Sequence, residues 1–262
     1  MGTRSPRLLI CLLVFAMLAL SWTPAFAYLD LSTWSRMGPT ANGTWTVSAD
    51  HRLVTETING QPTFFVSPEA YFNTTITGKF RPASNSDDDF IGLAFGYQTP
   101  LGTGNDYHLY LLDWKQGTQN NGGYIAQPGF TLSYINGVIP STSYVKYFWG
   151  HTDDAVLDQL GTSYGSTRGW ADNTEYTFTL LYTANRIKID IQGGSGDFMN
   201  GETIFDLSGS FPSGRFAFYN YSELGALYFD VTATPIPLPG AVWLLGSGLL
   251  GLGVFRRKFL RA

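Results

Sequence analysis

Three adjacent carboxylates, Asp87-Asp88-Asp89, directly precede an apolar segment that begins at Phe90. Like charges repel one another, so three in a row are tolerated where solvent surrounds them or where they share a cation. Calcium is a hard cation that prefers oxygen ligands, carboxylates above all. We therefore predict that Asp87, Asp88 and Asp89 bind calcium, and a solvated acidic turn is the alternative.

Two further acidic groups are weaker candidates for the same chemistry. Asp153 and Asp154 are adjacent, and Asp172 is followed by Asn173. The sequence contains no EF-hand spacing, so calcium ligands would have to converge from separate loops. Asp153, Asp154 and Asp172 are therefore additional candidate metal ligands, and calcium is the cofactor that the sequence predicts.

Aromatic side chains near the acidic groups are candidates for contact with carbohydrate, because sugar rings stack on the faces of Trp and Tyr. Trp149 and Trp170 flank an acidic, Gly-rich stretch, and His151 lies close to Asp153. These three residues are the predicted ligand-binding positions. Packing beneath the loop is the alternative for the tryptophans, and a plain surface position is the alternative for His151.

The sequence lacks the patterns of two common hydrolase classes. Laminarinase-type glycoside hydrolases place their carboxylates as Glu-x-Asp-x-(x)-Glu along one strand, whereas the segment from Lys188 to Gln192 has lysine and glutamine at the two glutamate positions. The segment from Gly161 to Gly165 matches Gly-x-Ser-x-Gly, but polar residues on both sides predict a loop rather than a strand-to-helix elbow. We therefore expect no catalytic residue.

The elements that position these residues are predicted to be short strands. Between Arg186 and Ile191, apolar and charged residues alternate with the period of two that is typical of a half-buried strand. Similar runs lie at 44–47, 63–66, 71–80, 90–97, 107–112, 176–182, 215–219 and 226–231. Only Asp153 to Leu160 resembles a helical turn. The pattern predicts one all-β domain, a sandwich or jelly roll, over residues 28–234.

Three segments together resemble the C-terminal lectin-like domain of thrombospondins. They run from Asp87 to Gln98, from Tyr110 to Gln119 and from Trp149 to Asp172, and weaker similarity extends from about Trp45 to Thr232. The resemblance implies a concanavalin A-like jelly roll of two antiparallel sheets, calcium bound at loops, and contact with a matrix or cell surface without catalysis.

Two departures from that family bear on function. The cysteine that the family carries near its last strands is replaced around Phe218 and Tyr219, and the calcium-binding repeats that precede the domain in thrombospondins are not found here. A function that needs those repeats is not expected of this chain.

The first 27 residues have the pattern of a secretory signal peptide. Arg4 and Arg7 precede an apolar stretch from Leu8 to Leu20, and Ala25 and Ala27 form an Ala-x-Ala cleavage site. A retained N-terminal anchor is the alternative. The single cysteine, Cys11, lies inside this segment, so the mature chain is expected to have no disulfide.

The last segment, residues 235–262, resembles a bacterial PEP-CTERM sorting signal in a Pro-Leu-Pro variant. Its parts are a proline motif, an apolar run over 240–255 that we predict to be a transmembrane helix, and a basic end; the motif residues are Pro237, Leu238, Pro239, Arg256, Arg257 and Lys258. The resemblance implies recognition by an exosortase in a Gram-negative bacterium that makes extracellular polysaccharide. A plain C-terminal anchor is the alternative.

Charge excludes one class of partner. The chain has 16 basic and 20 acidic residues, and six of the basic residues lie in terminal segments that contain no acidic residue. The domain therefore carries ten basic and 20 acidic residues, and a field of this sign repels nucleic acid. No nucleic-acid partner is expected.

These observations predict an exported, non-catalytic surface or extracellular-matrix protein with a calcium-binding, lectin-like adhesion domain. Its expected route is an inner-membrane-anchored precursor that then reaches the cell surface or matrix. Its expected partners are an exosortase, the membrane, and extracellular polysaccharide or another surface protein. A lectin with a defined glycan specificity is the first alternative, and a polysaccharide-active hydrolase is the second.

Overall fold

The structure is a computed structural model that describes residues 27–38, 42–100 and 104–236. Most of the predicted signal peptide, the sorting motif and the span predicted over 240–255 lie outside the described residues, so these features stay predictions. Within the described ranges, no helix has both the length and the apolar character needed to cross a membrane.

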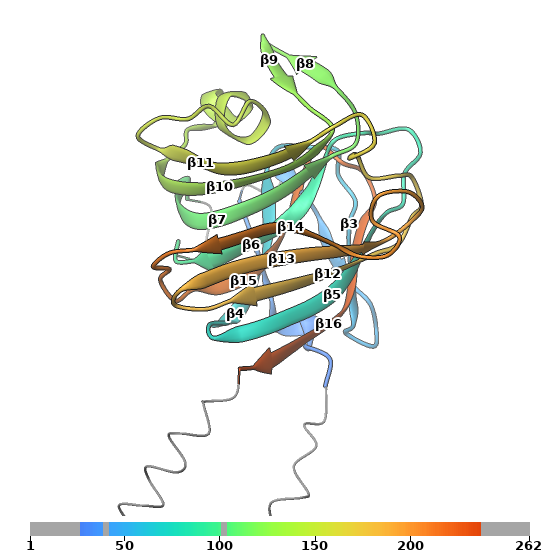
Figure 1. The fold of residues 1–262 in the computed structure, drawn as a ribbon, viewed down its shortest axis with the longest axis vertical. Coiled ribbons are helices and arrows are strands. Elements are labelled where there is room, and N and C mark those ends of the chain that lie inside the picture. The colour runs from blue at the N-terminus through green and yellow to red at the C-terminus, as the bar shows by residue number, and fades with distance from the viewer. Residues whose placement is uncertain (1–26, 39–41, 101–103, 237–262) are drawn as a thin grey trace, which may run out of the picture.

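The described chain forms two seven-stranded sheets in which every paired strand is antiparallel (Figure 1). The first sheet consists, in spatial order, of β1 (Ser35–Met37), β4 (Thr63–Ala70), β15 (Arg215–Tyr221), β6 (Phe90–Tyr97), β7 (Asp106–Lys115), β10 (Gly129–Val138) and β11 (Leu157–Tyr164). The second consists of β14 (Glu202–Ser208), β13 (Arg186–Gly193), β12 (Tyr176–Tyr182), β5 (Thr74–Pro82), β16 (Ala226–Pro235), β3 (Leu53–Glu56) and β2 (Trp45–Val47). The prediction of an all-β sandwich is confirmed.

Alternation along the strands builds the core between the two sheets. In β13, Ile187, Ile189 and Ile191 are fully buried, while Lys188 and Asp190 between them face outward. Aromatic rings fill much of the same core, and Trp114 of β7 stacks on Phe130 of β10 with their ring centroids 4.3 Å apart. Trp114 is therefore part of the core.

The first sheet is also covered on its outer face by its own chain. The covering segments carry the hairpin of β8 (Gln119–Asn121) and β9 (Tyr124–Ala126) and two short helical elements, η3 (Ser141–Ser143) and η4 (Val145–Trp149). Phe148 of η4 packs edge-on against Phe64 and Tyr107 of the sheet. Every residue of β6 is therefore buried, because a strand with both faces covered has no solvent side.

Two local predictions are wrong. The segment from Asp153 to Leu160 was expected to form a helical turn, but Leu157–Tyr164 is strand β11 and the nearby turns are η3 and η4. The Gly161 to Gly165 segment was expected to be a loop, but most of it belongs to the same strand. β11 is the edge strand of its sheet and has a mostly polar, half-exposed pattern, so it lacks the apolar alternation that marks a strand in sequence.

Different parts of the chain lie at the two ends of the sandwich. The register of β5 and β16 pairs Pro235 with Thr74 at one end and Ala226 with Pro82 at the other. Tyr28, which bridges to Thr232, and Ile236, whose amide donates to Asn73, lie at the first end (Figure 1). The loops that follow β5, β7 and β15 meet at the second end, together with the loop that precedes β12.

Candidate metal centre

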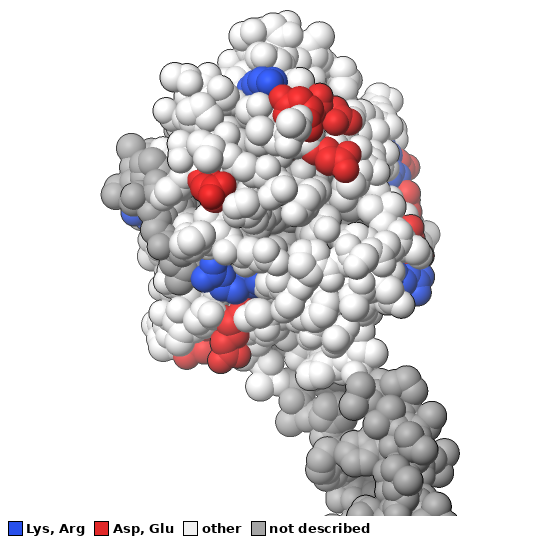
Figure 2. Space-filling view, turned by 90° about the vertical axis from the view of Figure 1, so that its left-hand side faces the viewer, with Lys and Arg blue, Asp and Glu red and all other residues white. Residues whose placement is uncertain are grey.

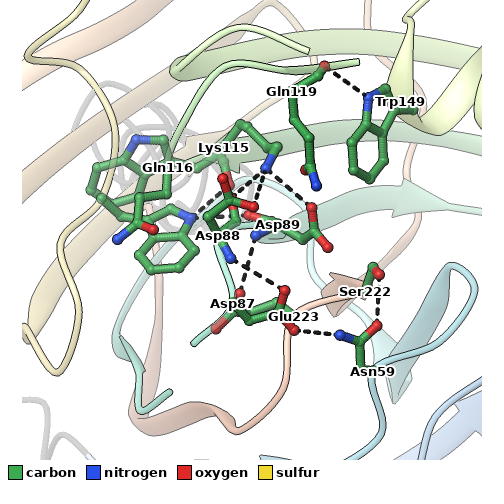
Figure 3. A network of polar contacts seen from close by, with 12 residues as sticks. Asn59, Asp87, Asp88, Asp89, Lys115, Gln116, Gln119, Trp149, Ser222 and Glu223 are labelled. Carbon is green, nitrogen blue, oxygen red and sulfur yellow. Dashed lines mark hydrogen bonds and ion pairs between the residues drawn. The ribbon is translucent and has the colours of Figure 1, made fainter. Parts of the chain in front are cut away.

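Five charged residues from three separate stretches of chain meet at the second end of the sandwich. Asp87, Asp88 and Asp89 close the loop between β5 and β6, Lys115 ends β7, and Glu223 lies in the loop between β15 and β16. The strand register explains the meeting, because Phe90 pairs with both Lys115 and Tyr221. We name these five residues the acidic loop cluster (Figure 3).

Lys115 is the basic side chain of the cluster, and it is completely buried. Its Nζ donates to the Asp88 carbonyl at 2.5 Å, to Asp88 Oδ1 at 3.0 Å and to Asp89 Oδ1 at 3.1 Å. The ammonium group also lies 5.2 Å from the ring centroid of Trp149. The cluster therefore holds one basic group and four carboxyl groups, which gives a formal excess of three negative charges when all four are ionised.

The three aspartates come together as the sequence predicts. One carboxylate oxygen from each lies within 4.8 Å of the others. Asp87 Oδ2 accepts from the Asn59 side chain at 2.6 Å and from the Leu224 amide at 3.2 Å. Asp89 is only 5% exposed, and burial raises its pKa to about 6 despite the nearby Lys115.

Glu223 is the carboxylate of the cluster that sequence reasoning missed, and Lys115 was not predicted either. Its side chain is fully buried, and its Oε2 accepts from the Asp89 amide at 3.2 Å. Its Oε1 has no hydrogen-bond partner in the described part of the chain. Burial and the charge of Asp87 raise the pKa of Glu223 to about 9, so its ionised form is strongly disfavoured without a further cation.

The residues present fit a hard divalent cation. All the donors are oxygens, one buried acceptor lacks a partner, and the negative charge exceeds the positive charge. An acidic turn in free solvent does not describe this arrangement, because Asp89 and Glu223 are buried. Asp87, Asp88, Asp89 and Glu223 are thus the residues that could hold calcium.

The other predicted metal ligands lie apart from this group. Asp172 is exposed and accepts from the Gln116 amide at 2.7 Å, at the same end of the sandwich but outside the carboxylate group. Asp153 and Asp154 are exposed in the segment that follows η4. Asp154 already pairs with Lys146 at 2.6 Å, which lowers its pKa to about 2.

The three predicted ligand-binding residues are buried: Trp149 is 3% exposed, His151 5% and Trp170 2%. Trp170 Nε1 donates to the carbonyl groups of Asp89 and Trp114, so its indole packs beneath the acidic loop cluster. His151 Nε2 lies 2.6 Å from Asp113 Oδ2, in a buried hydrogen bond. Burial supports packing for the tryptophans and contradicts a surface position for His151, whereas the ligand contact predicted for these three residues stays a prediction.

A sequence signal exists for one of the missed residues. Lys115 shares the face of β7 that carries Leu109 and Leu111, so alternation places its charge in a buried position, which requires a partner. Glu223 lies in a Ser-Glu-Leu-Gly loop and has no comparable signal.

Comparisons with known proteins agree with this fold. A family model described as the thrombospondin C-terminal region matches residues 40–234. Among the relatives are thrombospondin-2 of Gallus gallus, 24% identical over 199 residues, and thrombospondin-3 of Homo sapiens, 26% identical over 197 residues. Each alignment covers 71% of this chain but only 16% and 20% of the relative, so the chain matches a small part of these longer proteins.

Solved structures with lectin-like sandwiches are similar in fold. The exoplasmic domain of VIP36 in a Ca2+/Man3GlcNAc-bound form superposes with a TM-score of 0.52 at 12% identity, over 82% of this chain and 88% of that one. The carbohydrate-binding module CBM66 from Bacillus subtilis gives 0.50 at 13% identity, over 79% and 99%. Taken with the extent of the family match, these findings show that the chain belongs to the thrombospondin C-terminal region family.

Proposed function

We propose that this protein is an exported, non-catalytic surface or matrix protein whose adhesion domain binds calcium at the acidic loop cluster. Asp87, Asp88, Asp89 and Glu223 are the proposed ligands. The observation that carries the proposal is Glu223, a fully buried carboxylate with one unpartnered oxygen beside three aspartates and one lysine. Calcium bound there would offset the excess negative charge and link the loops that follow β5 and β15.

Adhesion is supported by family membership. Cartilage oligomeric matrix protein of Rattus norvegicus, whose name places it in a matrix, is 24% identical over 194 residues, although the match covers 25% of its length. Figure 2 shows the basic side chains of one face in small separate groups, so this face presents no continuous basic patch to a polyanion. A lectin with a defined glycan is the second candidate, and the Man3GlcNAc-bound form of the VIP36 domain, which is similar in fold, supports it.

The geometry also suits attachment through the C-terminus. Ile236 lies at the end of the sandwich opposite to the acidic loop cluster. A chain anchored beyond this residue would therefore present the cluster away from the membrane. We propose the corresponding route, in which an exosortase recognises Pro237-Leu238-Pro239 and the basic end after the signal peptide is removed.

Thermal unfolding of the exported full-length chain in detergent tests calcium binding. Calcium is expected to raise the melting temperature and a chelator to lower it, because a ligand that binds only the folded state stabilises that state. Glu223→Gln is expected to abolish most of the calcium shift. It should not lower the melting temperature in chelator, because a carboxyl group with a pKa of about 9 is already protonated at neutral pH.

Glu69→Gln, a change at an exposed glutamate of β4, is the matched control and should keep the full calcium shift. Wild-type protein with equal melting temperatures in calcium and chelator would rule out the metal site. Absence of hydrolysis of β-glucans by the same preparation is expected, since the segment around Asp190 holds a Lys188 ion pair instead of a carboxylate pair.

Cell fractionation tests the proposed route. A chain that ends at residue 236 is expected to lose its association with the inner membrane and to appear outside the cell. Persistence of this truncated chain in the membrane fraction would contradict the proposed role of residues 237–262.

A further inference from the structure

The strands β12, β13 and β14 are neighbours in the second sheet (Figure 1). A hollow of about 230 Å³ lies over them, on the outer face of the sheet. The side chains that line it and carry the inference are Thr177, Asp190, Gln192, Asn200, Glu202 and Thr203. We name this depression the outer hollow. It shares no residue with the acidic loop cluster.

A local irregularity in the sheet helps to form the outer hollow. Ile189 pairs with Phe205 but Asp190 pairs with Thr203, so a bulge interrupts the register of β13 and β14 at this point. Gly201 begins the approach to β14 with a φ of +83°, a conformation that side chains rarely adopt. The bulge and the glycine leave a depression where a regular sheet would present a flat surface.

The carboxylates of the outer hollow are electrically balanced. Asp190 accepts from Lys188 at 2.7 Å through each of its oxygens and also accepts from Thr203. Glu202 accepts from the two terminal nitrogens of Arg168 at 2.6 and 2.9 Å. Each carboxylate of the wall is paired with a cation, although Arg168 also lies 3.7 Å from Asp197, which does not line the hollow.

Other polar groups in the outer hollow remain available to a ligand. The Thr177 hydroxyl and the amides of Gln192 and Asn200 form no side-chain hydrogen bond among the described residues, although they lie beside one another in the same hollow. Hydroxyl and amide groups both donate and accept hydrogen bonds. They therefore complement a neutral ligand with several hydroxyl groups, and each hydroxyl of a sugar ring has the same dual character.

We propose that the outer hollow binds one ring of a neutral polysaccharide through Thr177, Gln192 and Asn200, while Asp190 and Glu202 form its fixed walls. The size fits this assignment, because the hollow is smaller than the ~300–1,000 Å³ of pockets that enclose a drug-sized ligand. One sugar ring would bind in the hollow, and the rest of the polysaccharide would continue across the outer face of the second sheet. The proposal deepens the adhesion role given above and rests on it, but it does not require calcium at the acidic loop cluster.

An oligosaccharide microarray tests the proposal on the exported full-length chain in detergent. The probes are neutral glucan, mannan, galactan and fructan oligosaccharides, with uronic-acid oligosaccharides as charged comparators. We expect selective binding to at least one neutral series. Titration calorimetry with the best neutral probe should then show at least a tenfold loss of affinity in a Gln192→Ala/Asn200→Ala double variant and a smaller loss in Thr177→Ala.

The matched control is Thr75→Ala, which removes a half-exposed threonine from the same outer face, on β5 and outside the hollow. It should keep wild-type affinity, and all variants should keep the wild-type melting temperature. The proposal is overturned by binding that both hollow variants retain, by a preference for the charged comparators, or by no binding to any neutral series.

Glu223→Gln separates this proposal from the calcium proposal. This variant should lose the calcium-dependent melting shift yet bind the neutral probe with wild-type affinity well below its melting temperature. Loss of the calcium shift in wild-type protein would refute the metal site alone, and loss of sugar binding would refute the outer hollow alone.

Discussion

The acidic loop cluster and the outer hollow differ in how their charges are balanced. In the cluster, four carboxylates surround one buried ammonium group, and Glu223 keeps an unpartnered oxygen. In the hollow, Asp190 and Glu202 are each paired with a cation of their own. The first arrangement has room in its charge balance for a further cation, as proposed, whereas the carboxylates of the second are already paired and suit an uncharged ligand.

Burial explains why the same residue types have such different properties in the two regions. Glu223 and Asp89 lie almost entirely out of solvent, and desolvation raises the pKa of each. Asp190 and its partner Lys188 are about one-third exposed, so water screens their charges. Changes to charge should therefore have large effects in the cluster and small ones in the hollow.

Removal of the buried cation should give the largest effect. Lys115→Met leaves the carboxylates without a positive charge, and loss of one partner from a buried ion pair costs about 3–5 kcal/mol of unfolding free energy. Urea denaturation in chelator measures this loss. Lys188→Met is the control on the hollow, where an ion pair of this exposure contributes at most about 1 kcal/mol. Equal losses for the two variants would contradict the comparison.

Calcium should reverse part of that loss. A divalent cation replaces the missing charge, so the gain in unfolding free energy on adding calcium should be larger for Lys115→Met than for wild-type protein. For wild type, the gain at 100 times Kd is about 2.7 kcal/mol. The same urea series with and without calcium checks this, and an equal or smaller gain in the variant would show that Lys115 and the cation do not share the carboxylates.

The cluster also predicts an unusual pH dependence without calcium. The folded pKa values of Asp89, about 6, and Glu223, about 9, exceed their ordinary values of 3.8 and 4.5. The folded state then holds more protons than the unfolded state, so stability is fully present below about pH 4 and falls as pH rises towards 9. Calcium should flatten this slope. Urea midpoints measured between about pH 4 and 9 test this prediction. Stability that rises with pH in chelator would contradict the raised pKa values of Asp89 and Glu223.

Glu56 shares in the same pH dependence and allows the cluster to be isolated. It is a fully buried glutamate of β3, and burial raises its pKa to about 7. Glu56→Gln should make the fall in stability between about pH 4.5 and 7 shallower and leave the fall above pH 7 in place, whereas Glu223→Gln should remove the part that extends to about 9. Only the second change should alter the response to calcium.

The smallest effect is expected at the wall of the outer hollow. Arg168→Gln breaks a two-pronged pair with Glu202 that is partly open to solvent, and it should cost about 1 kcal/mol. The variant should also change specificity. Without the positive charge of Arg168, Glu202 should repel the uronic-acid probes and weaken their binding further. Stronger binding of these charged probes by the variant would be inconsistent with a neutral hollow.

Sequence reasoning reached the sandwich because period-two alternation is a strong signal in central strands. The segments 90–97 and 176–182 agree with β6 and β12 at both ends. Among the strands it missed are β11 and β14, edge strands with polar patterns that resemble loops, and β10, a central strand whose first five residues are all buried and therefore show no alternation. Apolar and polar residues alternate where a strand buries one face and exposes the other, and an edge strand buries fewer apolar side chains.

The candidate site was predicted in part for a related reason. Asp87, Asp88 and Asp89 are adjacent in sequence, so their meeting needed no knowledge of the fold. Glu223 reaches them only through the pairing of β6 with β15. Trp149 and Trp170 flank polar loops in sequence, but both are buried: Trp149 lies under the chain that covers the outer face of the first sheet, and Trp170 lies in the core between the sheets, beneath the acidic loop cluster.

Proton release on calcium binding tests the central claim most directly. Glu223 is protonated at pH 8 in the absence of a cation and must ionise to become a ligand. Titration calorimetry of calcium into the full-length chain, in buffers of different ionisation enthalpy, should therefore show one site that releases protons, and Glu223→Gln should release far fewer. Calcium binding without proton release, or no binding at all, would contradict the account.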